Sequence, residues 1–332
     1  MKYAVIGLGA VGSIVGGLIA RSGEDVLLIG KKNQVQVINK NGLRIEGVEK
    51  KAVLIKNVKT SSDFSSLKDV DVIFFCVKSQ DTEELAVKIK EYLKESAVVI
   101  SLQNGVRNKD VIENITKSKT LSGIVLFNAF YSEPGHVTLS IKGDLFIEED
   151  DSVSPNIFRS LEKAGLKIKT AKNFQGFLYS KLIVNLQIAV TALTDQTIKE
   201  SIIDNITRKI LVAAMNEGID VVQKSGIVLE TLPEIDPRKM VKTLSRFGSI
   251  TLRIGSRLIG LNDNARNSMW QSLARGKTTE VDYINGEIVK LAKNNNLDAP
   301  INEKLVELIK EAEKKHLTKS FEPAELKEIL KL

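Results

Sequence analysis

A strand-like run near the start of the chain, Tyr3–Ile6, leads directly into a glycine-rich loop. Gly7, Gly9 and Gly12 follow with the spacing G-x-G-x-x-G, and a helical pattern begins there. The first glycine of such a loop permits a tight turn, the second lets the backbone approach a ligand, and the third allows close helix–strand packing. The backbone N–H groups and the positive end of the helix then attract an anion. This context predicts a dinucleotide-binding loop, with a tight crossover that binds nothing as the alternative.

The residues expected to bind the cofactor through this loop are Gly7, Leu8, Gly9, Ala10, Val11 and Gly12. The end of the next strand pattern, Val26–Ile29, indicates which dinucleotide. An acidic residue there would hold the ribose 2′-hydroxyl of NAD, but this chain has Gly30 followed by Lys31 and Lys32. A lysine can pair with the 2′-phosphate of NADP. We therefore predict NADP (NADPH), with Lys31 as a contact and NAD less favoured; two solvated surface lysines are the alternative.

Further polar side chains follow apolar elements. Lys78 and Asn104 each come after an apolar strand pattern, so both are expected at the carboxyl edge of a parallel sheet, where ligands bind. Lys181 and Asn185 are four residues apart and therefore share one face of a helix. Glu280 begins another helical pattern, where an acid also complements the helix dipole. A surface cation, a turn and a snorkelling lysine are the alternatives for Lys78, Asn104 and Lys181.

The elements that must position these residues divide the chain in two. In the first half, strand patterns alternate with helical patterns, which predicts a parallel sheet with helices on both faces. The expected strands are Tyr3–Ile6, Val26–Ile29, Val72–Val77, Val98–Ser101 and Leu121–Phe127. The expected helices are Gly12–Arg21, Asp81–Leu93 and Asn108–Ile115. A hairpin within residues 133–150 is expected to end the strands, before a helix from Pro155 to Ala164.

From about Phe174 the apolar residues recur at helical spacing to the end of the chain. We therefore predict an α/β fold in which a Rossmann-type doubly wound sheet is followed by an all-helical C-terminal domain. Residues 1–170 form the expected NADP-binding domain, and residues 171–332 form the expected substrate and catalytic domain. The apolar faces of the helical half are sufficient for a homodimer.

Composition argues against several classes of function. The net charge is +7, but basic residues are interleaved with acids and no basic block alternates with aromatics, so no nucleic-acid partner is expected. The single cysteine, Cys76, cannot form an internal disulfide, as is typical of the reducing cytoplasm. No leader precedes the first strand and no apolar run reaches membrane-spanning length, so a cytoplasmic location without a membrane partner is expected. His136 and His316 have no triad or metal-ligand context, so no metal is expected.

Several short stretches resemble, in order and spacing, the ketopantoate reductases (2-dehydropantoate 2-reductases). They are GLGAVGS, CVKSQDT, SLQNGV, EPGHV, SKLIVN and RGKTTEVDYINGEIV. The likeness spans nearly the whole chain, and the QNGV, Lys-x-x-x-Asn and TTEVDYINGEIV stretches are much more specific than the glycine loop. The resemblance implies NADPH-dependent reduction of ketopantoate to pantoate, a step of pantothenate and coenzyme A biosynthesis.

The resemblance also implies roles for single residues. Lys78 matches a cofactor-contacting lysine, Asn104 a contact of both nicotinamide ribose and substrate, and Ala129 a cofactor-contact alanine. In the helical half, Lys181 matches the catalytic, substrate-contacting lysine, and Asn185 and Ser268 match substrate contacts. Glu280 matches a glutamate beside the cofactor. The implied mechanism passes hydride to the keto carbon while Lys181 donates a proton to the carbonyl oxygen and Glu280 orients or balances that lysine.

The likeness breaks on the substrate side. Ala189 stands where the family has a second substrate asparagine, a further asparagine expected near Ile198–Lys199 is missing, and Ser272 replaces an acid. Lost polar contacts weaken the case for ketopantoate itself, because polar recognition discriminates strongly between substrates. The alternatives are a related NAD(P)-dependent reductase of another 2-oxo acid, a dehydrogenase of a sugar-derived or phosphorylated ketone, and a cofactor-binding sensor without catalysis.

Overall fold

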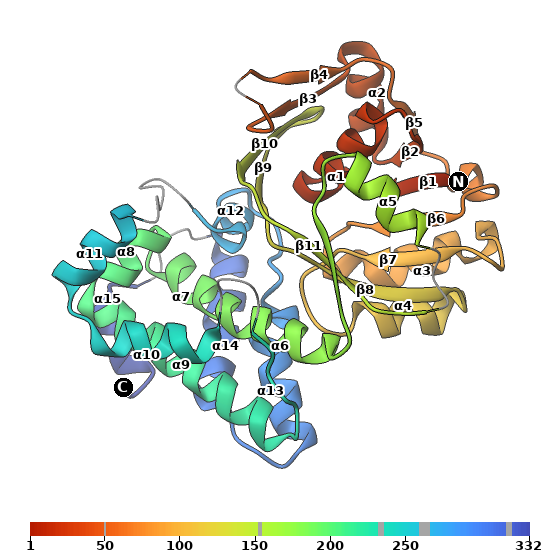
Figure 1. Ribbon diagram of the computed structural model, residues 1–332. Helices are drawn as coiled ribbons and strands as arrows, with labels where there is room; N and C mark the ends of the chain where they lie inside the picture. Colours follow the sequence, from red (N-terminus) through yellow and green to blue (C-terminus); the bar gives the residue numbers. More distant parts are fainter. Residues whose placement is uncertain (50, 152–154, 232–235, 259–265, 317–320) are drawn as a thin grey trace. The chain divides into compact units, whose positions relative to one another are not determined.

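The computed structural model describes residues 1–332 except 50, 152–154, 232–235, 259–265 and 317–320. The chain divides into two compact units, Met1–Phe174 and Gln175–Leu332 (Figure 1). This division lies close to the domain boundary expected after residue 170. The mixed α/β class, with a parallel-sheet unit followed by a helical unit, is confirmed.

Among the described residues of unit 1, eight strands form the main sheet in the order β12-β11-β8-β7-β6-β1-β2-β5. They are β1 Lys2–Ile6, β2 Asp25–Ile29, β5 Lys59–Ser61, β6 Val72–Phe75, β7 Val98–Ser101, β8 Lys119–Val125, β11 Leu145–Glu148 and β12 Ile168–Ala171. From β5 to β8 all neighbours are parallel. Numbered along the chain, these six strands have the order 3-2-1-4-5-6 of doubly wound dinucleotide-binding sheets. The chain crosses from β5, at one edge of the sheet, to β6 on the other side of β1, so the carboxyl ends of β1 and β6 are the expected ligand side.

Helices cover both faces of this sheet (Figure 1). They are α1 Ala10–Arg21, α2 Lys32–Asn41, α3 Thr82–Ile89, α4 Asn108–Thr116 and α5 Asn156–Lys163, with short 3-10 turns at Phe64–Leu67, Ser79–Asp81 and Lys90–Tyr92. Successive residues of β1 enter different cores: Tyr3 and Val5 pack in one cluster with residues of α1 and α5, and Ala4 and Ile6 in another with residues of α3 and α4. Because its side chains alternate between two buried faces, β1 is apolar from Tyr3 to Ile6, after an exposed Lys2.

A second sheet has the order β4-β3-β10-β9 and packs against α1. Its strands are β3 Leu43–Glu46, β4 Val53–Ile55, β9 Asn128–Glu133 and β10 His136–Ile141. The expected hairpin within residues 133–150 is wrong: β10 and β11 fall there but belong to different sheets. β10 instead pairs antiparallel with β9, and Gly135 turns the chain between them with φ +76°. Nor do the strands end there, since β11 and β12 add to the edge of the main sheet.

In the described part of unit 2 the chain is helical throughout. The elements are α6 Phe174–Asn185, α7 Gln187–Leu193, α8 Ile198–Ile203, α9 Asn205–Lys224, α10 Pro237–Arg246, α11 Ser249–Leu258, α12 Ser268–Ala274, a 3-10 turn η4 Val281–Tyr283, α13 Asn285–Asn294, α14 Pro300–Lys315 and α15 Pro323–Ile329. α9 packs closely on the junction of α6 and α7, because Gly218 has no side chain: a Cβ there would lie 2.5 Å from Leu186 Cδ1. The site helices are thus held against the long helix of the unit.

One sequence expectation about membranes is wrong as stated. The stretch Phe174–Leu193, which comprises α6 and α7, is 20 residues long and apolar enough to cross a membrane by length and composition. However, 67% of its most apolar window is buried inside the structure. A buried core helix passes the same test, so the stretch is only weak evidence for a membrane span.

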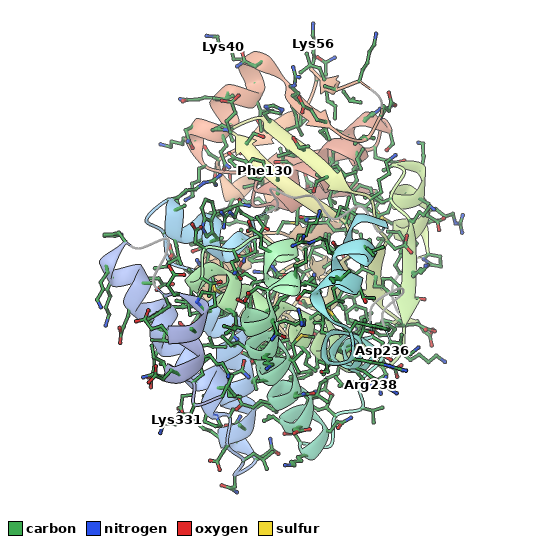
Figure 2. All side chains as sticks on the ribbon, turned by 90° about the vertical axis from the view of Figure 1, so that its left-hand side faces the viewer. Lys40, Lys56, Phe130, Asp236, Arg238 and Lys331 are labelled. Atoms are coloured by element: carbon green, nitrogen blue, oxygen red, sulfur yellow. The ribbon has the colours of Figure 1, made fainter. Side chains whose placement is uncertain are left out.

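The surplus of basic residues is spread over the surface. Figure 2 shows Lys40, Lys56 and Lys331 projecting from separate parts of the chain, and all three are exposed. Arg238 is paired with Asp236 at the start of α10. Basic side chains distributed in this way are typical of a solvated surface.

Candidate active site

The glycine loop joins β1 to α1, and at Gly7 and Gly12 it packs tightly against the rest of unit 1. Gly7 has φ +100°, and a Cβ there would lie 2.7 Å from Val77 Cγ1. A Cβ on Gly12 would lie 2.0 Å from the Gly7 carbonyl oxygen. Only glycine fits these two positions, since any side chain would displace backbone or the neighbouring strand loop. At Gly9, by contrast, an added Cβ meets nothing within 4 Å.

The start of α1 is suited to an anion. Gly9 is its N-cap and supplies no side-chain cap, and the first turn contains no acidic residue. The first N–H groups of a helix have no partner within the helix, and its dipole is positive there. With Gly9 open toward the outside, these groups fit the pyrophosphate of a dinucleotide. Leu8, Ala10 and Val11 belong to the same turn, and the Leu8 side chain is buried, so Leu8 could offer a ligand only its backbone.

Gln34, which the sequence analysis missed, ties this loop to its surroundings. Its Nε2 donates to the Leu8 carbonyl at 2.8 Å and to the Tyr131 hydroxyl at 3.0 Å, and its Oε1 accepts from the Lys31 backbone N–H at 3.1 Å. The Lys31 side chain is exposed just beyond the carboxyl end of β2. Ala129 lies two residues before Tyr131 on β9 and so shares its face of the strand. The signal for Gln34 was its place three residues after Lys31, the N3 position of α2.

The loops that carry Lys78 and Asn104 lie side by side at the carboxyl ends of β6 and β7. The Asn104 carbonyl accepts from Ser79 Oγ at 2.7 Å and from Asn108 Nδ2 at 2.6 Å. Gln103 Nε2 donates to the Val77 carbonyl at 3.1 Å, directly before Lys78. A buried polar network therefore fixes both loops relative to each other. Its side chains, each at most 6% exposed, are those of Ser79, Thr82, Ser101, Gln103 and Asn108.

In unit 2, Lys181 and Asn185 lie one turn apart on α6, and both are half-buried. The helix is interrupted immediately after Asn185. The Leu186 carbonyl there accepts from Asn285 Nδ2 at 3.3 Å, and the same amide donates to Asn302 Oδ1 at 2.9 Å. Asn285 and Asn302 are fully buried. Two buried amides therefore hold the end of α6 against the first turns of α13 and α14.

Glu280 stands at the N-cap position of the 3-10 turn η4 without a side-chain capping hydrogen bond, and α13 begins only at Asn285. The single helix that we expected from Glu280 onward is therefore interrupted, because Ile284 leaves helical geometry with φ −120° and ψ −87°. Burial lowers the pKa of Lys181 to about 8, and the negative charge of Glu280 opposes this shift. The Lys181 ammonium group is thus more acidic than an ordinary lysine, and it interacts electrostatically with the Glu280 carboxylate on another element.

A small pocket in unit 2, too narrow in this structure to admit a water molecule, is lined by both Ser268 and Glu280. Its walls also include one further hydroxyl, Ser272, and the apolar side chains of Ile188, Met269 and Ile284. Ser268 is exposed at the start of α12 and Ser272 lies one turn further along. Ala189, where the resemblance implied an asparagine, is fully buried, and its neighbour Ile188 lines the pocket instead. Glu280 thus lines the pocket together with Ser268 and also acts through its charge on Lys181. One of the departures, Ser272, lines the same pocket.

The cysteine and His136 lie in packed or ion-paired surroundings in unit 1. Cys76 follows β6 and packs against the core of unit 1, and burial raises the pKa of its thiol. His136 lies on β10 within 3.2 Å of Glu46. Within the described ranges, no cluster of His, Cys, Asp and Glu could hold a metal ion.

Two family models match the chain. The one described as "Ketopantoate reductase PanE/ApbA" matches residues 3–152, and "Ketopantoate reductase PanE/ApbA C terminal" matches residues 173–313. A 2-dehydropantoate 2-reductase of Pyrococcus horikoshii is 32% identical over 321 residues, which cover 94% of this chain and 98% of the relative. The chain belongs to the ketopantoate reductase family.

Solved structures agree with membership in the ketopantoate reductase family. A PanE/ApbA family ketopantoate reductase from Ralstonia eutropha matches with a TM-score of 0.83 and 32% identity, covering 95% of this chain and 99% of that one. A structure of D-mandelate dehydrogenase with NADH and anilino(oxo)acetate matches with a TM-score of 0.80 and 27% identity, over 95% and 99% of the two chains. The protein is therefore an oxidoreductase of a family that acts on small molecules with a nicotinamide dinucleotide.

Proposed function

We propose that this protein reduces 2-dehydropantoate (ketopantoate) to pantoate with NADPH, in pantothenate and coenzyme A biosynthesis in the cytoplasm. The observation that carries the proposal is the Lys181 amine, whose pKa burial lowers to about 8 and which is coupled to Glu280 beside a pocket that contains Ser268. An acid whose pKa is close to the working pH is suited to donate a proton to a developing alkoxide. The name of the Pyrococcus horikoshii relative, a 2-dehydropantoate 2-reductase, supports the substrate.

NADPH, when bound, would supply the hydride that reduces the keto carbon. The glycine loop would hold its pyrophosphate at the start of α1, and Lys31 would hold its 2′-phosphate. Lys78, Asn104 and Ala129 would contact the rest of the cofactor. The buried network around Gln103 supports this assignment, because it fixes the Lys78 and Asn104 loops before any ligand arrives.

On the substrate side, Lys181 would hydrogen-bond the keto oxygen and then donate its proton to it. With a pKa of about 8, roughly nine tenths of the amine is protonated at neutral pH. Glu280 would keep this fraction high, because its negative charge favours the ammonium form. Asn104, Asn185 and Ser268 would bind and orient the substrate.

A second candidate is reduction of another 2-oxo acid, with NADH as a competing cofactor. It is favoured by the match to D-mandelate dehydrogenase, whose structure contains NADH and anilino(oxo)acetate. It is also favoured by Ala189 and Ser272, because neither supplies the amide or the acid that the resemblance implied. The pocket wall contains Ile188 and the small hydroxyl of Ser272.

Oxidation of the reduced cofactor by the purified protein tests both candidates. Ketopantoate, branched aliphatic 2-oxo acids and benzoylformate are each supplied with NADPH and with NADH. The proposal expects the highest kcat/KM for ketopantoate with NADPH. A preference for another 2-oxo acid or for NADH favours the second candidate, and cofactor binding without turnover of any 2-oxo acid contradicts both.

A further inference from the structure

Helix α12 carries Ser268 at its first position and is held to the end of α7 by contacts on both sides of that serine. Asn267, only 8% exposed, donates from Nδ2 to the Ile188 carbonyl at 3.1 Å and to the Thr191 hydroxyl. Its Oδ1 accepts from the Trp270 backbone N–H at 2.8 Å and so caps α12. The residue before Ser268 therefore joins the two helices directly.

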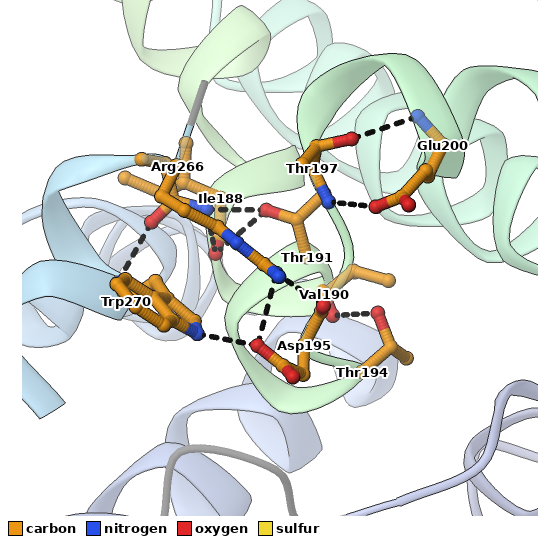
Figure 3. Close-up of polar contacts among 10 residues, drawn as sticks. Ile188, Val190, Thr191, Thr194, Asp195, Thr197, Glu200, Arg266 and Trp270 are labelled. Atoms are coloured by element: carbon orange, nitrogen blue, oxygen red, sulfur yellow. Dashed lines mark hydrogen bonds and ion pairs between the residues drawn. The ribbon is translucent and has the colours of Figure 1, made fainter. Parts of the chain in front are cut away.

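The second set of contacts converges on Asp195, just after α7 (Figure 3). Its Oδ1 accepts from Trp270 Nε1 at 2.7 Å and lies 2.9 Å from Arg266 Nη1, which also donates to the Asp195 carbonyl. The Arg266 guanidinium lies over the Trp270 ring, 4.9 Å from its centroid. Asp195 has φ +54°, a left-handed conformation that Asp tolerates better than most residues. We name Asp195, Arg266, Asn267 and Trp270 the α12 latch.

The latch matters because α12 has only seven residues. Isolated helices of this length are unstable in water, so tertiary contacts must determine where α12 lies. Ser268 and Met269 lie between the two ends of the latch and both line the pocket. Ile188, whose carbonyl Asn267 binds, lines the same pocket. The latch thus joins the pocket wall that contains Ile188 to the wall that contains Ser268.

We propose that the α12 latch positions Ser268 for the substrate and so sets affinity for the 2-oxo acid without contacting it. Asp195, Arg266 and Trp270 are positioning residues that act through Ser268, and this role rests on the proposed function. Removing the latch loosens the hydroxyl in the pocket, which raises KM for the oxo acid. KM for the cofactor stays unchanged, because the glycine loop, Lys31 and Lys78 lie in unit 1. Glu280, which the resemblance places beside the cofactor, lies in unit 2 but is not part of the latch.

The test substitution is Asp195→Gly, because glycine removes the carboxylate yet accepts the positive φ without strain. Loss of a charged hydrogen bond with its ion pair predicts a rise in KM for the oxo acid of about tenfold, with little change in kcat. Asp195→Asn keeps an acceptor for the indole and predicts a smaller rise. The matched control is Asn296→Gly, at an exposed position with φ +53° in the loop after α13, which is expected to leave KM unchanged.

Two further measurements separate positioning from a general structural effect. Trp270 is the chain's one tryptophan, so its fluorescence reports the latch directly, and Asp195→Gly should shift its emission to the red. In a double-mutant cycle, Asp195→Gly should add little to the KM effect of Ser268→Ala, because both remove the same contact.

An unchanged KM for the oxo acid in Asp195→Gly, despite the emission shift, overturns the proposal, and so does full additivity with Ser268→Ala. If Asp195→Gly does not fold, Asp195→Asn and Arg266→Gln carry the same comparison. A wild-type protein that turns over no 2-oxo acid overturns the proposed function itself. That outcome is distinguishable, because it appears before any latch variant is made.

Discussion

The two units carry their functional residues in different ways. In unit 1 the glycine loop depends on the space around the backbone. Gly7 and Gly12 leave no room for a side chain, and Gly9 faces open space. In unit 2 the functional side chains are ordinary residues on helices, and contacts between distant segments decide where they point. Asn285 and Asn302 hold the end of α6, and the α12 latch holds Ser268. A backbone site is visible in a local motif, whereas a site built on helix packing is not.

Removing the Lys181 amine should have the largest effect. In Lys181→Ala, kcat should fall about a thousandfold, because a positioned general acid contributes roughly 10²–10⁴-fold. The Kd for NADPH should not change, since the cofactor loop is in the other unit. Steady-state kinetics and a cofactor-binding titration measure the two quantities. Lys290→Ala, at an exposed lysine of α13, is the control. Turnover within tenfold of wild type would remove Lys181 from the mechanism.

Substitutions at two of the three loop glycines, Gly12 and Gly9, should have separate effects on stability and on cofactor binding. A Cβ at Gly12 would clash with the Gly7 carbonyl at 2.0 Å, so Gly12→Ala should lower the midpoint of thermal unfolding by many degrees. Gly9→Ala meets no protein atom and should unfold like wild type. Its methyl group instead occupies the space expected for the pyrophosphate, so Kd for NADPH should rise at least about tenfold. Equal NADPH affinity in Gly9→Ala and wild type would show that the loop is only a crossover.

The sequence was sufficient for the strands that are buried on both faces, because an apolar run such as Val72–Phe75 is conspicuous. It was not sufficient for β3, β4 and β5, which have three or four residues each and are partly exposed. The edge strand β12 was missed for the same reason. In the site, spacing indicated that Lys181 and Asn185 share a face. It could not indicate Asn285, 99 residues from the Leu186 carbonyl that it binds, or Asp195, 75 residues from Trp270.

The coupling of Lys181 to Glu280 predicts a shift in the pH profile. The amine must be protonated to act as an acid, so kcat should fall as the pH rises through about 8. The Glu280 carboxylate raises the pKa of Lys181, so Glu280→Gln should move this alkaline limb to lower pH. Glu307→Gln, at an exposed acid on α14, should leave the limb in place. A limb that moves to higher pH in Glu280→Gln would contradict the assigned coupling.

The smallest effect is expected just after β2, where two adjacent exposed lysines, Lys31 and Lys32, offer a matched pair. Lys31→Ala should lower the ratio of kcat/KM for NADPH to that for NADH by about fivefold, because an exposed ion pair contributes at most about 1 kcal/mol. Lys32→Ala should leave the ratio unchanged. Raising the salt concentration should reduce the difference between Lys31→Ala and wild type, because exposed charges are screened. If Lys32→Ala changes the ratio instead, the neighbouring lysine is the phosphate contact. If neither variant changes the ratio, these lysines do not recognise the 2′-phosphate. The structure of D-mandelate dehydrogenase with NADH is then the better guide to the cofactor.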